Sequence, residues 1–225
     1  MDISIIYEDR DIIVCQKQGG IAVQTPRIGQ QDMVSILKNY RVLKKEEPYI
    51  GIIHRLDQPV EGVMVFAKTK AAAASLSKQI AQRTTDKYYL AVVQGKFAEQ
   101  QGVLEHDLVR DGRNNLSHVA KPGEKDAKHA RLSYEVLEYQ PEADESLVRI
   151  HLDTGRHHQI RVQMAAIGHP LVGDQKYNPQ AQRIRVNVAL CSCEIAFAHP
   201  STGKREHFRI VPSNPFFGRF TDINV

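Results

Sequence analysis

The sequence IIHRLDQPVEG, residues 52–62, places Arg55 and Asp57 inside an apolar segment that is interrupted at Pro59. Charged side chains are seldom left in such surroundings unless a partner or a reaction needs them. Because Pro59 cannot donate to a strand ladder and Gly62 permits unusual dihedral angles, we expect a short irregular turn between two strands, with Asp57 on it. Taken alone, such a turn more often holds an aspartate that bonds only its own backbone.

The segments on either side of this turn predict one α+β domain. Residues 3–7 and 12–15 form the pattern of an antiparallel hairpin around a polar turn, and Asp32 can cap the first helix. The other predicted elements are a short helix that carries Gln159 and Arg161, a helix at residues 70–82 and strands at residues 50–53, 63–66, 88–93, 130–138, 146–153 and 188–197. Strands outnumber helices and do not alternate regularly with them, so we predict a mixed, mostly antiparallel β-sheet with a few flanking helices.

Residues 95–127 are the least regular part of the chain, with turn-forming segments at residues 111–115 and 121–123. They predict a polar and basic loop. A mobile flap that faces a substrate and an ordinary surface excursion explain this loop about equally well.

Length and composition fit a single domain over residues 1–225, of which 42% are apolar. No stretch approaches the ~20 consecutive apolar residues that cross a bilayer, and the N-terminus begins with acidic rather than basic residues. We therefore predict a cytoplasmic protein without a membrane segment. The three cysteines are an odd number, and Cys191-Ser192-Cys193 lacks the second ligand pair of a structural zinc site, so we expect reduced, packed thiols.

The net charge of +4 is modest, but lysines and arginines gather in a few segments. On one face of the fold such segments would bind phosphate, although charge alone favours a solvated surface. His54 and Asp57 lie three residues apart, yet no recurrent ligand pattern accompanies them, so we predict no metal site.

A second group of polar residues is Thr154-Gly155-Arg156-His157-His158-Gln159, with Arg161 close behind it. It stands where a predicted strand ends and a short helix begins. An arginine placed there can bind a carboxylate through two nitrogens, and so keep that carboxylate ionised and aimed. The alternative is a solvated basic turn.

Taken together, His54-Arg55-Leu56-Asp57 with Gly62 and Thr154-Gly155-Arg156-x-His158-Gln159-Ile160-Arg161 resemble motifs of the RluA-type family of RNA pseudouridine synthases. Further motifs in the family's order are Tyr7-Glu8-Asp9, Lys17-x-x-Gly20, Lys87-x-Tyr89-x-Ala91-x-Val93-x-Gly95, His169-Pro170-Leu171-x-Gly173-Asp174-x-x-Tyr177 and Phe197-x-His199-Pro200. They extend over nearly the whole chain, so the joint resemblance is far more specific than any single motif.

The resemblance implies isomerisation of a uridine already within RNA: the N1 glycosidic bond breaks, the base turns, and C5 joins the same sugar. It implies no cofactor. Asp57 resembles the catalytic aspartate, which either attacks the sugar C1′ or takes a proton from C2′, and a carboxylate suits both routes. Arg161 resembles the arginine that pairs with this aspartate and holds it ionised. Tyr89 resembles the tyrosine whose ring stacks on the extruded base and whose hydroxyl lies near C5.

The resemblance also implies a set of residues that contact RNA or the target base. Arg55 resembles the residue that enters the base stack where the uridine leaves it. Leu190 fits the apolar position beneath the base, with core packing as an equally good alternative. His54 is expected to support the turn that carries Asp57. Arg156 and His158, from the second motif, complete the predicted RNA-binding residues.

The chain departs from the family's pattern at four places, one of which is Gln18 in place of the usual Pro after Lys17. Val60-Glu61 replaces the usual Thr-Ser after the aspartate, His157 replaces a Thr, and Cys191-Ser192 replaces His-Ala. None of these changes touches the predicted catalytic Asp, Tyr or Arg. Glu61 adds a negative charge near Asp57, which would disfavour the ionised aspartate, or repel phosphate if it faces the RNA.

The chain begins directly with the predicted hairpin, so we expect no N-terminal S4-type RNA-binding domain and RNA recognition by the catalytic domain itself. This favours a compact partner, a stem-loop of tRNA or rRNA that is read by its shape and its extruded bases. We expect a monomer with no obligate protein partner.

Two other function classes stay open. A non-catalytic RNA-binding protein or RNA chaperone could keep the fold, although Asp57, Tyr89 and Arg161 are all present. A sugar-cleaving hydrolase typically needs a second carboxylate about 5 to 10 Å from the first, and Glu61 is the nearby candidate.

Overall fold

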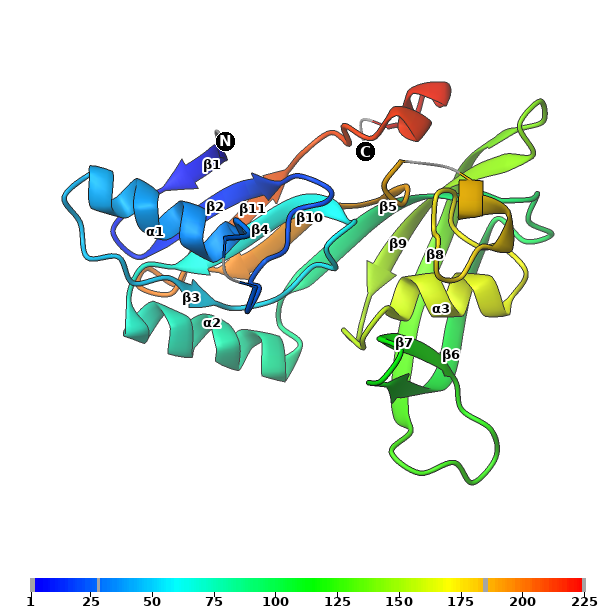
Figure 1. Ribbon diagram of the computed structural model, residues 1–225, viewed down its shortest axis with the longest axis horizontal. Coiled ribbons are helices and arrows are strands. Elements are labelled where there is room, and N and C mark those ends of the chain that lie inside the picture. Colours follow the sequence, from blue (N-terminus) through cyan, green and yellow to red (C-terminus); the bar gives the residue numbers. More distant parts are fainter. Residues whose placement is uncertain (1–2, 28, 184–185, 224–225) are drawn as a thin grey trace. The chain divides into compact units, whose positions relative to one another are not determined.

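The computed structural model describes residues 3–27, 29–183 and 186–223. The chain divides into two compact units, which we call unit 1, Met1–Lys87 with Ser192–Ile210, and unit 2, Tyr88–Cys191 with Val211–Val225 (Figure 1). This division does not test the prediction of one domain over residues 1–225. Within the described ranges, no helix is long and apolar enough to span a membrane.

Unit 1 is built on antiparallel strand pairs. Its strands are β1 Ser4–Glu8, β2 Ile12–Lys17, β3 Gly51–Ile52, β4 Glu61–Ala67, β10 Leu190–Ala198, whose first two residues belong to unit 2, and β11 Arg205–Arg209. Its helices are α1 Met33–Leu43 and α2 Lys70–Gln82. The strand order is β1-β2-β4-β10, with β3 also paired to β4 and β11 to β10. The hairpin predicted at the start of the chain is therefore confirmed as β1 and β2.

Both helices of unit 1 begin at capped residues. The side chains of Asp32 and Thr69 accept the N–H groups of Ser35 and Ala72, which the first helical turn leaves without backbone partners. Apolar side chains from β2, β4, β10 and α2 form one core cluster: Ile12, Val14, Val63, Val65, Leu76, Ile195 and Phe197. This core anchors β4, which begins directly after the turn that carries Asp57.

Unit 2 also consists of antiparallel strands, with one α-helix among its described residues. Its strands are β5 Asp86–Gln94, whose first two residues belong to unit 1, β6 Gln101–Asp111, β7 Leu116–Val119, β8 Lys128–Gln140 and β9 Glu145–Leu152. Their order is β5-β9-β8-β6-β7, and every neighbouring pair is antiparallel. Helix α3, Gln159–Ala166, packs on this sheet because Val162 contacts Leu108 of β6 and Ala130 of β8. Two short 3₁₀ helices, Pro179–Arg183 and Pro215–Arg219, complete the unit.

The predicted fold class is confirmed, because the described residues form mostly antiparallel strands with three α-helices. The prediction of a loop over residues 95–127 is wrong, since β6 and β7 make a hairpin of most of it. Residues of β6 alternate between exposed and half-buried, and Leu108 is its buried residue, so the strand lacks an apolar run. Strand β11 was missed for the same reason. All three cysteines are buried thiols, as predicted, and burial raises the pKa of the Cys15 thiol to about 12.

Candidate active site

Asp57 lies on a turn whose main chain is fixed by hydrogen bonds within unit 1. The Val60 N–H donates to the Asp57 carbonyl at 3.0 Å, and the Gly20 N–H donates to the Gln58 carbonyl at 2.8 Å. The side-chain amide of Gln58 donates in return to the Gly20 carbonyl at 3.0 Å. Leu56 and Val60 are buried on either side. The half-buried Asp57 therefore stands on a rigid turn between β3 and β4, where the sequence predicts it.

Gly62, the second residue of β4, is required by a close contact. Its φ of +153° is one that side chains rarely adopt, and a Cβ there would lie 2.5 Å from the Ser192 Cβ and 2.7 Å from the Ser192 nitrogen. Both distances are shorter than real side chains tolerate. The strand can therefore follow the Asp57 turn at this position only because residue 62 has no side chain.

Lys17, the last residue of β2, is fully buried beside this turn. Its ammonium donates to the carbonyls of Ile21, Gln18 and Gln58 at 2.7, 3.0 and 3.1 Å. Burial lowers the pKa of Lys17 to about 7, although the negative charges of Asp57 and Glu61 act in the opposite direction. The sequence pointed to Lys17 only through a family motif, because a pattern of apolar residues does not reveal a buried lysine.

The side chains of His54 and Arg55, which lie on the same turn, have different surroundings. The Nε2 atom of His54 accepts the Val65 N–H of β4 at 3.2 Å. Burial, with a smaller effect from Lys87, lowers the pKa of His54 to about 3, so its ring is neutral at pH 7. Arg55 is exposed and donates from Nη2 to the Gln24 carbonyl at 3.4 Å. His54 thus supports the neighbouring strand, whereas Arg55 reaches solvent.

Tyr88 and Tyr89 lie on opposite faces of β5, as strand geometry requires. Tyr89 is buried, and its partner across the ladder is Ile150. Tyr88 lies against His151, with ring centres 4.8 Å apart, and against Arg149, whose guanidinium carbon is 4.4 Å from the Tyr88 ring centre. A cavity of about 340 Å³ is lined by Tyr88 together with these two neighbours. The predicted catalytic tyrosine is therefore the buried one of the pair.

Arg161, on helix α3, is buried in a two-nitrogen ion pair with Asp174. Its Nε and Nη2 atoms lie 2.7 and 2.6 Å from the two carboxylate oxygens, and its guanidinium carbon lies 5.1 Å from the ring centre of Tyr177. Asp174 also accepts the N–H groups of Lys176 and Tyr177, at 2.9 and 3.3 Å. Sequence reasoning expected a carboxylate partner for Arg161 but missed Asp174 in that role.

The loop that leads into α3 is held by the side chain of Gln159. Its Oε1 accepts the Thr154 hydroxyl at 2.8 Å and the Arg156 N–H at 3.0 Å, while its Nε2 donates to the Arg131 carbonyl at 3.1 Å. Arg156 in turn donates from Nε to the His129 carbonyl at 2.9 Å. The second motif is therefore an ordered, hydrogen-bonded loop, and the alternative of a solvated basic turn is wrong.

His157 and His158 link this loop to other parts of unit 2, and their rings are stacked with centres 3.7 Å apart. His157 lies between two residues of the β6–β7 hairpin: its Nδ1 is 2.8 Å from the Ser117 hydroxyl and its Nε2 is 3.1 Å from Oδ1 of Asn115. The Nδ1 of His158 is 2.6 Å from the Tyr177 hydroxyl, which accepts the Ser117 N–H at 2.8 Å. The hairpin is thus tied to the start of α3 through His157, a residue at which the chain departs from its family's pattern.

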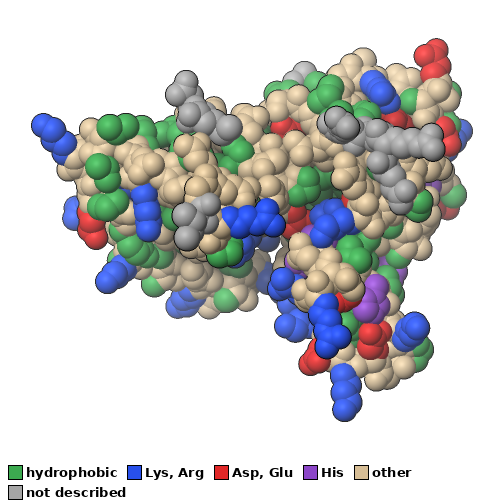
Figure 2. Space-filling view, in the orientation of Figure 1, with side chains coloured by type: hydrophobic (Ala, Val, Ile, Leu, Met, Phe, Trp, Pro, Cys, Tyr) green, Lys and Arg blue, Asp and Glu red, His purple; other side chains and the backbone are tan. Residues whose placement is uncertain are grey.

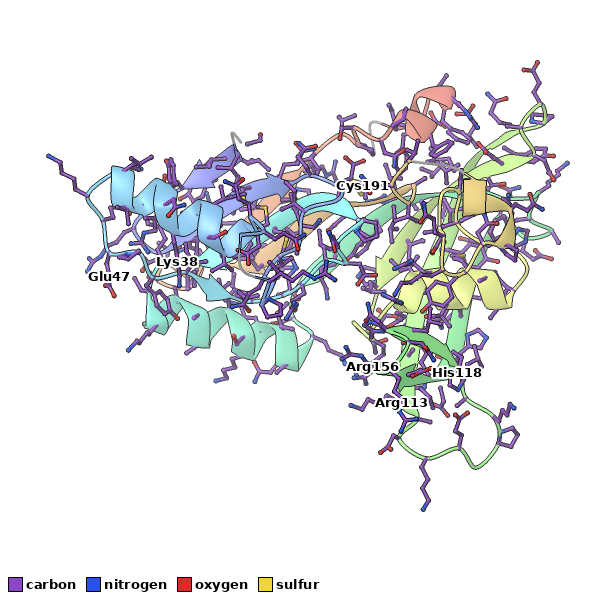
Figure 3. All side chains as sticks on the ribbon, in the orientation of Figure 1. Lys38, Glu47, Arg113, His118, Arg156 and Cys191 are labelled. Carbon is purple, nitrogen blue, oxygen red and sulfur yellow. The ribbon has the colours of Figure 1, made fainter. Side chains whose placement is uncertain are left out.

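The end of the β6–β7 hairpin and the loop after it form a basic arm, which we define as residues 110–128 (Figure 2). Its exposed basic residues are Arg110, Arg113, Lys121, Lys125 and Lys128. Figure 3 labels Arg113 on this arm and Arg156 on the loop that leads into α3, two segments that the hydrogen bond between His157 and Asn115 joins. Of the three acidic residues of the arm, Asp111 and Glu124 are engaged in hydrogen bonds within it, which leaves Asp126 against five basic residues. The arm therefore presents positive charge that suits phosphate groups.

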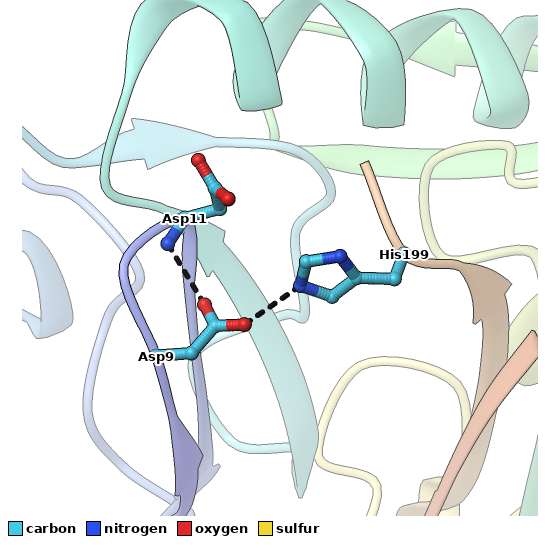
Figure 4. Close-up of side chains that lie close together, drawn as sticks. All are labelled: Asp9, Asp11 and His199. Carbon is cyan, nitrogen blue, oxygen red and sulfur yellow. Dashed lines mark hydrogen bonds and ion pairs between the residues drawn. The ribbon is translucent and has the colours of Figure 1, made fainter. Parts of the chain in front are cut away.

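Asp9, Asp11 and His199 come together at the turn between β1 and β2 (Figure 4). Oδ1 of Asp9 accepts the N–H groups of Asp11 and Ile12, at 2.8 and 2.9 Å, and its Oδ2 lies 2.7 Å from Nε2 of His199. Asp11 accepts the Ser201 hydroxyl at 2.6 Å. The protein's own donors occupy these oxygens, so the cluster ties the first hairpin to the turn after β10, and we assign no metal to it.

The predicted site residues fall into two groups, one in each unit. Unit 1 carries His54, Arg55 and Asp57 on a single turn. Unit 2 carries Tyr89, Arg156, His158, Arg161 and Leu190, of which Leu190 is buried at the start of β10. Sequence reasoning missed Lys17 in the first group, and Asp174 and Tyr177 in the second, as residues that hold the predicted ones in place.

Comparison with known proteins matches residues 11–166 to the family of RNA pseudouridylate synthases. The chain is 31% identical over 208 residues to the dual-specificity RNA pseudouridine synthase RluA of Yersinia pestis. The matched region covers 91% of this chain and 97% of that protein. It is 34% identical over 212 residues to the ribosomal large subunit pseudouridine synthase D of Nitrosomonas europaea. The matched region covers 90% of this chain and 60% of that protein.

A solved structure shares the fold. The structure of human RNA pseudouridylate synthase domain containing 1 matches with a TM-score of 0.78 at 26% sequence identity, covering 99% of this chain and 87% of that chain.

Proposed function

Since the chain belongs to the RluA-type family of RNA pseudouridine synthases, and is therefore an isomerase that acts on uridine in RNA, we propose that Asp57 is its catalytic carboxylate. We propose further that its target is one specific uridine in a stem-loop of tRNA or rRNA. The family membership carries the reaction type, and the placement of Asp57 carries the assignment of the residue.

The observation that supports Asp57 most directly is the way its turn is held. The N–H of Gly20 and the buried ammonium of Lys17 both donate to the carbonyl of Gln58, the residue directly after Asp57. A carboxylate that must attack C1′ or remove a proton from C2′ has to be ionised and fixed relative to the sugar, because small displacements are costly in rate. The turn meets the second requirement, and the nearby positive charge of Lys17 favours the first.

The residues of unit 2 take complementary roles in this proposal. Arg161 is the arginine that pairs with the catalytic aspartate in the family's pattern, and Asp174 fixes the plane of its guanidinium through the Nε and Nη2 edge. Tyr89 supplies the aromatic ring for the extruded uracil, and Leu190 the apolar surface beneath it. His158 acts through its hydrogen bond to Tyr177. No cofactor or metal is required for these steps.

RNA binding is assigned to exposed or half-buried cations. Arg55 fills the gap that the extruded uridine leaves in the base stack. Arg156 is oriented by its Nε bond to the main chain, which leaves its terminal nitrogens to bind phosphate, and the basic arm contributes further phosphate contacts. The basic arm and Arg156 suit the backbone of a folded stem-loop, whose shape is read together with its unpaired bases. The proposal includes a cytoplasmic monomer that needs no obligate protein partner.

The test is to map pseudouridine in total RNA from cells that have the wild-type protein, no protein, or Asp57→Asn. We expect one or a few uridines that are modified only with the wild type, and retained RNA binding by Asp57→Asn. Asp222→Asn, at an exposed position of unit 2, is the matched control and should behave as the wild type. An Asp57→Asn protein that still forms pseudouridine would sink the assignment.

The same experiment separates the alternative functions. A non-catalytic RNA chaperone would leave the pseudouridine map unchanged, and its cellular role would survive Asp57→Ala. A hydrolase that used Glu61 as its second carboxylate would release uracil from RNA, which chromatography of the reaction products detects.

A further inference from the structure

The buried ammonium of Lys17 takes no part in the bond changes proposed above, yet it is bound to the turn that carries Asp57. One of its three hydrogen bonds ends on the carbonyl of Gln58. The other two end on Gln18 and Ile21, in the segment that leaves β2. Lys17 therefore fastens the end of β2 to the main chain directly after Asp57.

Two carboxylates act on this ammonium, and they come from two different elements. Asp57 belongs to the turn, and Glu61 is the first residue of β4, where it is only 3% exposed. In the part of the chain that the structure describes, these two groups are the charges that act on Lys17. A buried carboxylate is costly without a cationic partner, so one buried lysine near both of them offsets part of that cost.

We propose that Lys17 is a positioning residue for Asp57 in the isomerisation, and that Glu61 is the second counter-charge that keeps Lys17 protonated inside the fold. The inference rests on the function proposed for Asp57. It gives a purpose to Glu61, which stands where the family's pattern has a serine. Because Glu61 is buried, it is not placed to repel the phosphates of the RNA.

The protonation state decides how firmly Lys17 holds the turn. An ammonium donates three hydrogen bonds, whereas a neutral amine donates two and carries no charge. The lowered pKa of about 7 means that a rise in pH through this value removes one of the three bonds together with the counter-charge of Asp57. We expect turnover to fall on the alkaline side while RNA binding is retained.

The first test compares the wild type with Lys17→Met, which keeps a long apolar side chain and removes the charge. We expect kcat to fall by about tenfold to a hundredfold, because the carboxylate is no longer held in place. The KM for RNA should stay within about twofold of the wild-type value. The alkaline loss of activity near pH 7 should disappear.

Lys78→Met, at an exposed position of α2, is the matched control and should keep the wild-type pH profile. A purely structural role for Lys17 would lower the amount of folded enzyme without changing the shape of the profile. Wild-type kcat and an unchanged profile in Lys17→Met would overturn the proposal.

The second test addresses the counter-charge through Glu61→Gln. Loss of this negative charge makes the proton leave Lys17 more easily, so the alkaline loss of activity, which we call the alkaline limb of the pH profile, should move to lower pH. Glu47→Gln makes the same change in net charge at an exposed position of unit 1, labelled in Figure 3, and should leave the limb in place. A limb that stays fixed in Glu61→Gln, or moves to higher pH, contradicts the role of Glu61.

A readout without turnover separates this inference from the proposed function. Unfolding free energies are measured from pH 6 to pH 10 for the wild type and Lys17→Met. The pKa of Lys17 is 10.5 in its ordinary state and about 7 in the fold, so between these values the unfolded chain holds a proton that the folded chain has lost. The wild type should therefore gain stability relative to Lys17→Met as the pH rises through this window.

Amide hydrogen exchange completes the test. The N–H groups of Val60 and Gly20 bond to the turn, so they should exchange faster in Lys17→Met than in Lys78→Met. If the wild type forms no pseudouridine, the proposed function fails, and exchange still decides whether Lys17 fixes the turn. A stability gap that does not change with pH, or unchanged exchange, overturns the inference whatever the activity.

Discussion

The two groups of site residues are held in place by different means. In unit 1 the Asp57 turn is fixed through its main chain: carbonyl oxygens accept bonds from Gly20 and from the ammonium of Lys17. In unit 2 the segment around Arg161 is fixed through its side chains, with Gln159 bonding the loop and Asp174 binding the guanidinium. The first device sets the course of the backbone, and the second sets the orientation of individual side chains.

The charges of the two groups also differ. Arg161 and Asp174 form a buried pair of opposite charges, with side chains that are 4% and 0% exposed. The Asp57 turn instead combines two carboxylates with one buried lysine, whose pKa of about 7 makes its charge depend on pH. A neutralised pair gives rigidity over a wide pH range, whereas a group that titrates near neutrality couples its contact to the pH. We therefore expect unit 2 to respond most to removal of a charge, and unit 1 to changes of pH.

The largest expected effect is on the buried pair of unit 2. Asp174→Asn removes the buried carboxylate charge that binds two nitrogens of the Arg161 guanidinium, and we expect a loss of about 3 to 5 kcal/mol in unfolding free energy, together with loss of pseudouridine formation. Chemical denaturation measures the first and RNA mapping the second. The exposed Asp222→Asn serves as the control for the same chemical change.

A double variant, Arg161→Met with Asp174→Leu, tests whether the charge itself is responsible. Removal of both charges leaves no buried guanidinium that has lost its Asp174 partner, so most of the stability should return while activity stays absent. If Asp174→Asn loses less than about 1 kcal/mol, the pair is not the support that its geometry indicates.

The next effect concerns His54 and shows the pH sensitivity of unit 1. The pKa of the ring is about 3 in the fold and 6.5 in its ordinary state, so between these values the unfolded chain binds a proton that the folded chain does not. Stability is therefore lost as the pH falls from 6.5 towards 3. Relative to His54→Gln, the wild type should lose stability with a slope of up to about 1.4 kcal/mol per pH unit.

At pH 7 the same variant reports a different contribution. The ring is neutral there, so His54→Gln changes mainly the hydrogen bond to the Val65 N–H, worth about 1 kcal/mol. Denaturant titrations at several pH values give both quantities. A stability difference that is the same at pH 4 and pH 7 would show that the imidazole is not excluded from water in the fold.

The parts of the fold that the sequence predicted are those with a strong local signal. Helix α2 was expected at residues 70–82 and lies at Lys70–Gln82, because an alanine-rich segment follows the cap Thr69. Strands with apolar runs, such as β4, were also found. Strands β6, β7 and β11 were not predicted. Most of their residues are exposed or half-buried, so these strands keep polar residues and lack an apolar run.

Prediction of the site residues was also limited to those with a local signal in the sequence. The Asp57 turn could be predicted, because two charges and a proline within an apolar segment are visible in the sequence itself. Lys17 and Asp174 could not be given their roles, because each acts through a partner distant in the sequence: Lys17 bonds Gln58, 41 positions away, and Asp174 bonds Arg161, 13 positions away. Only the fold shows that those groups meet.

The smallest expected effect is at His157, where unit 2 departs from its family's pattern. His157→Thr restores the family's residue, but a threonine hydroxyl cannot span from Ser117 to Asn115 as the ring nitrogens do. One hydrogen bond to the basic arm is lost together with the stacking on His158, so we expect about 0.5 to 1.5 kcal/mol less local stability. Faster amide exchange at Ser117 measures this loosening.

The functional consequence of His157→Thr should lie in RNA binding rather than in chemistry. The arm carries exposed lysines and arginines for phosphate, so a less ordered arm should weaken affinity by about twofold to tenfold and leave kcat at saturating RNA unchanged. His129→Thr, at an exposed position of β8, is the matched control. If kcat falls and the affinity stays constant, His157 acts on the reacting base, and the side-chain network of unit 2 reaches further into catalysis than its contacts with the arm indicate.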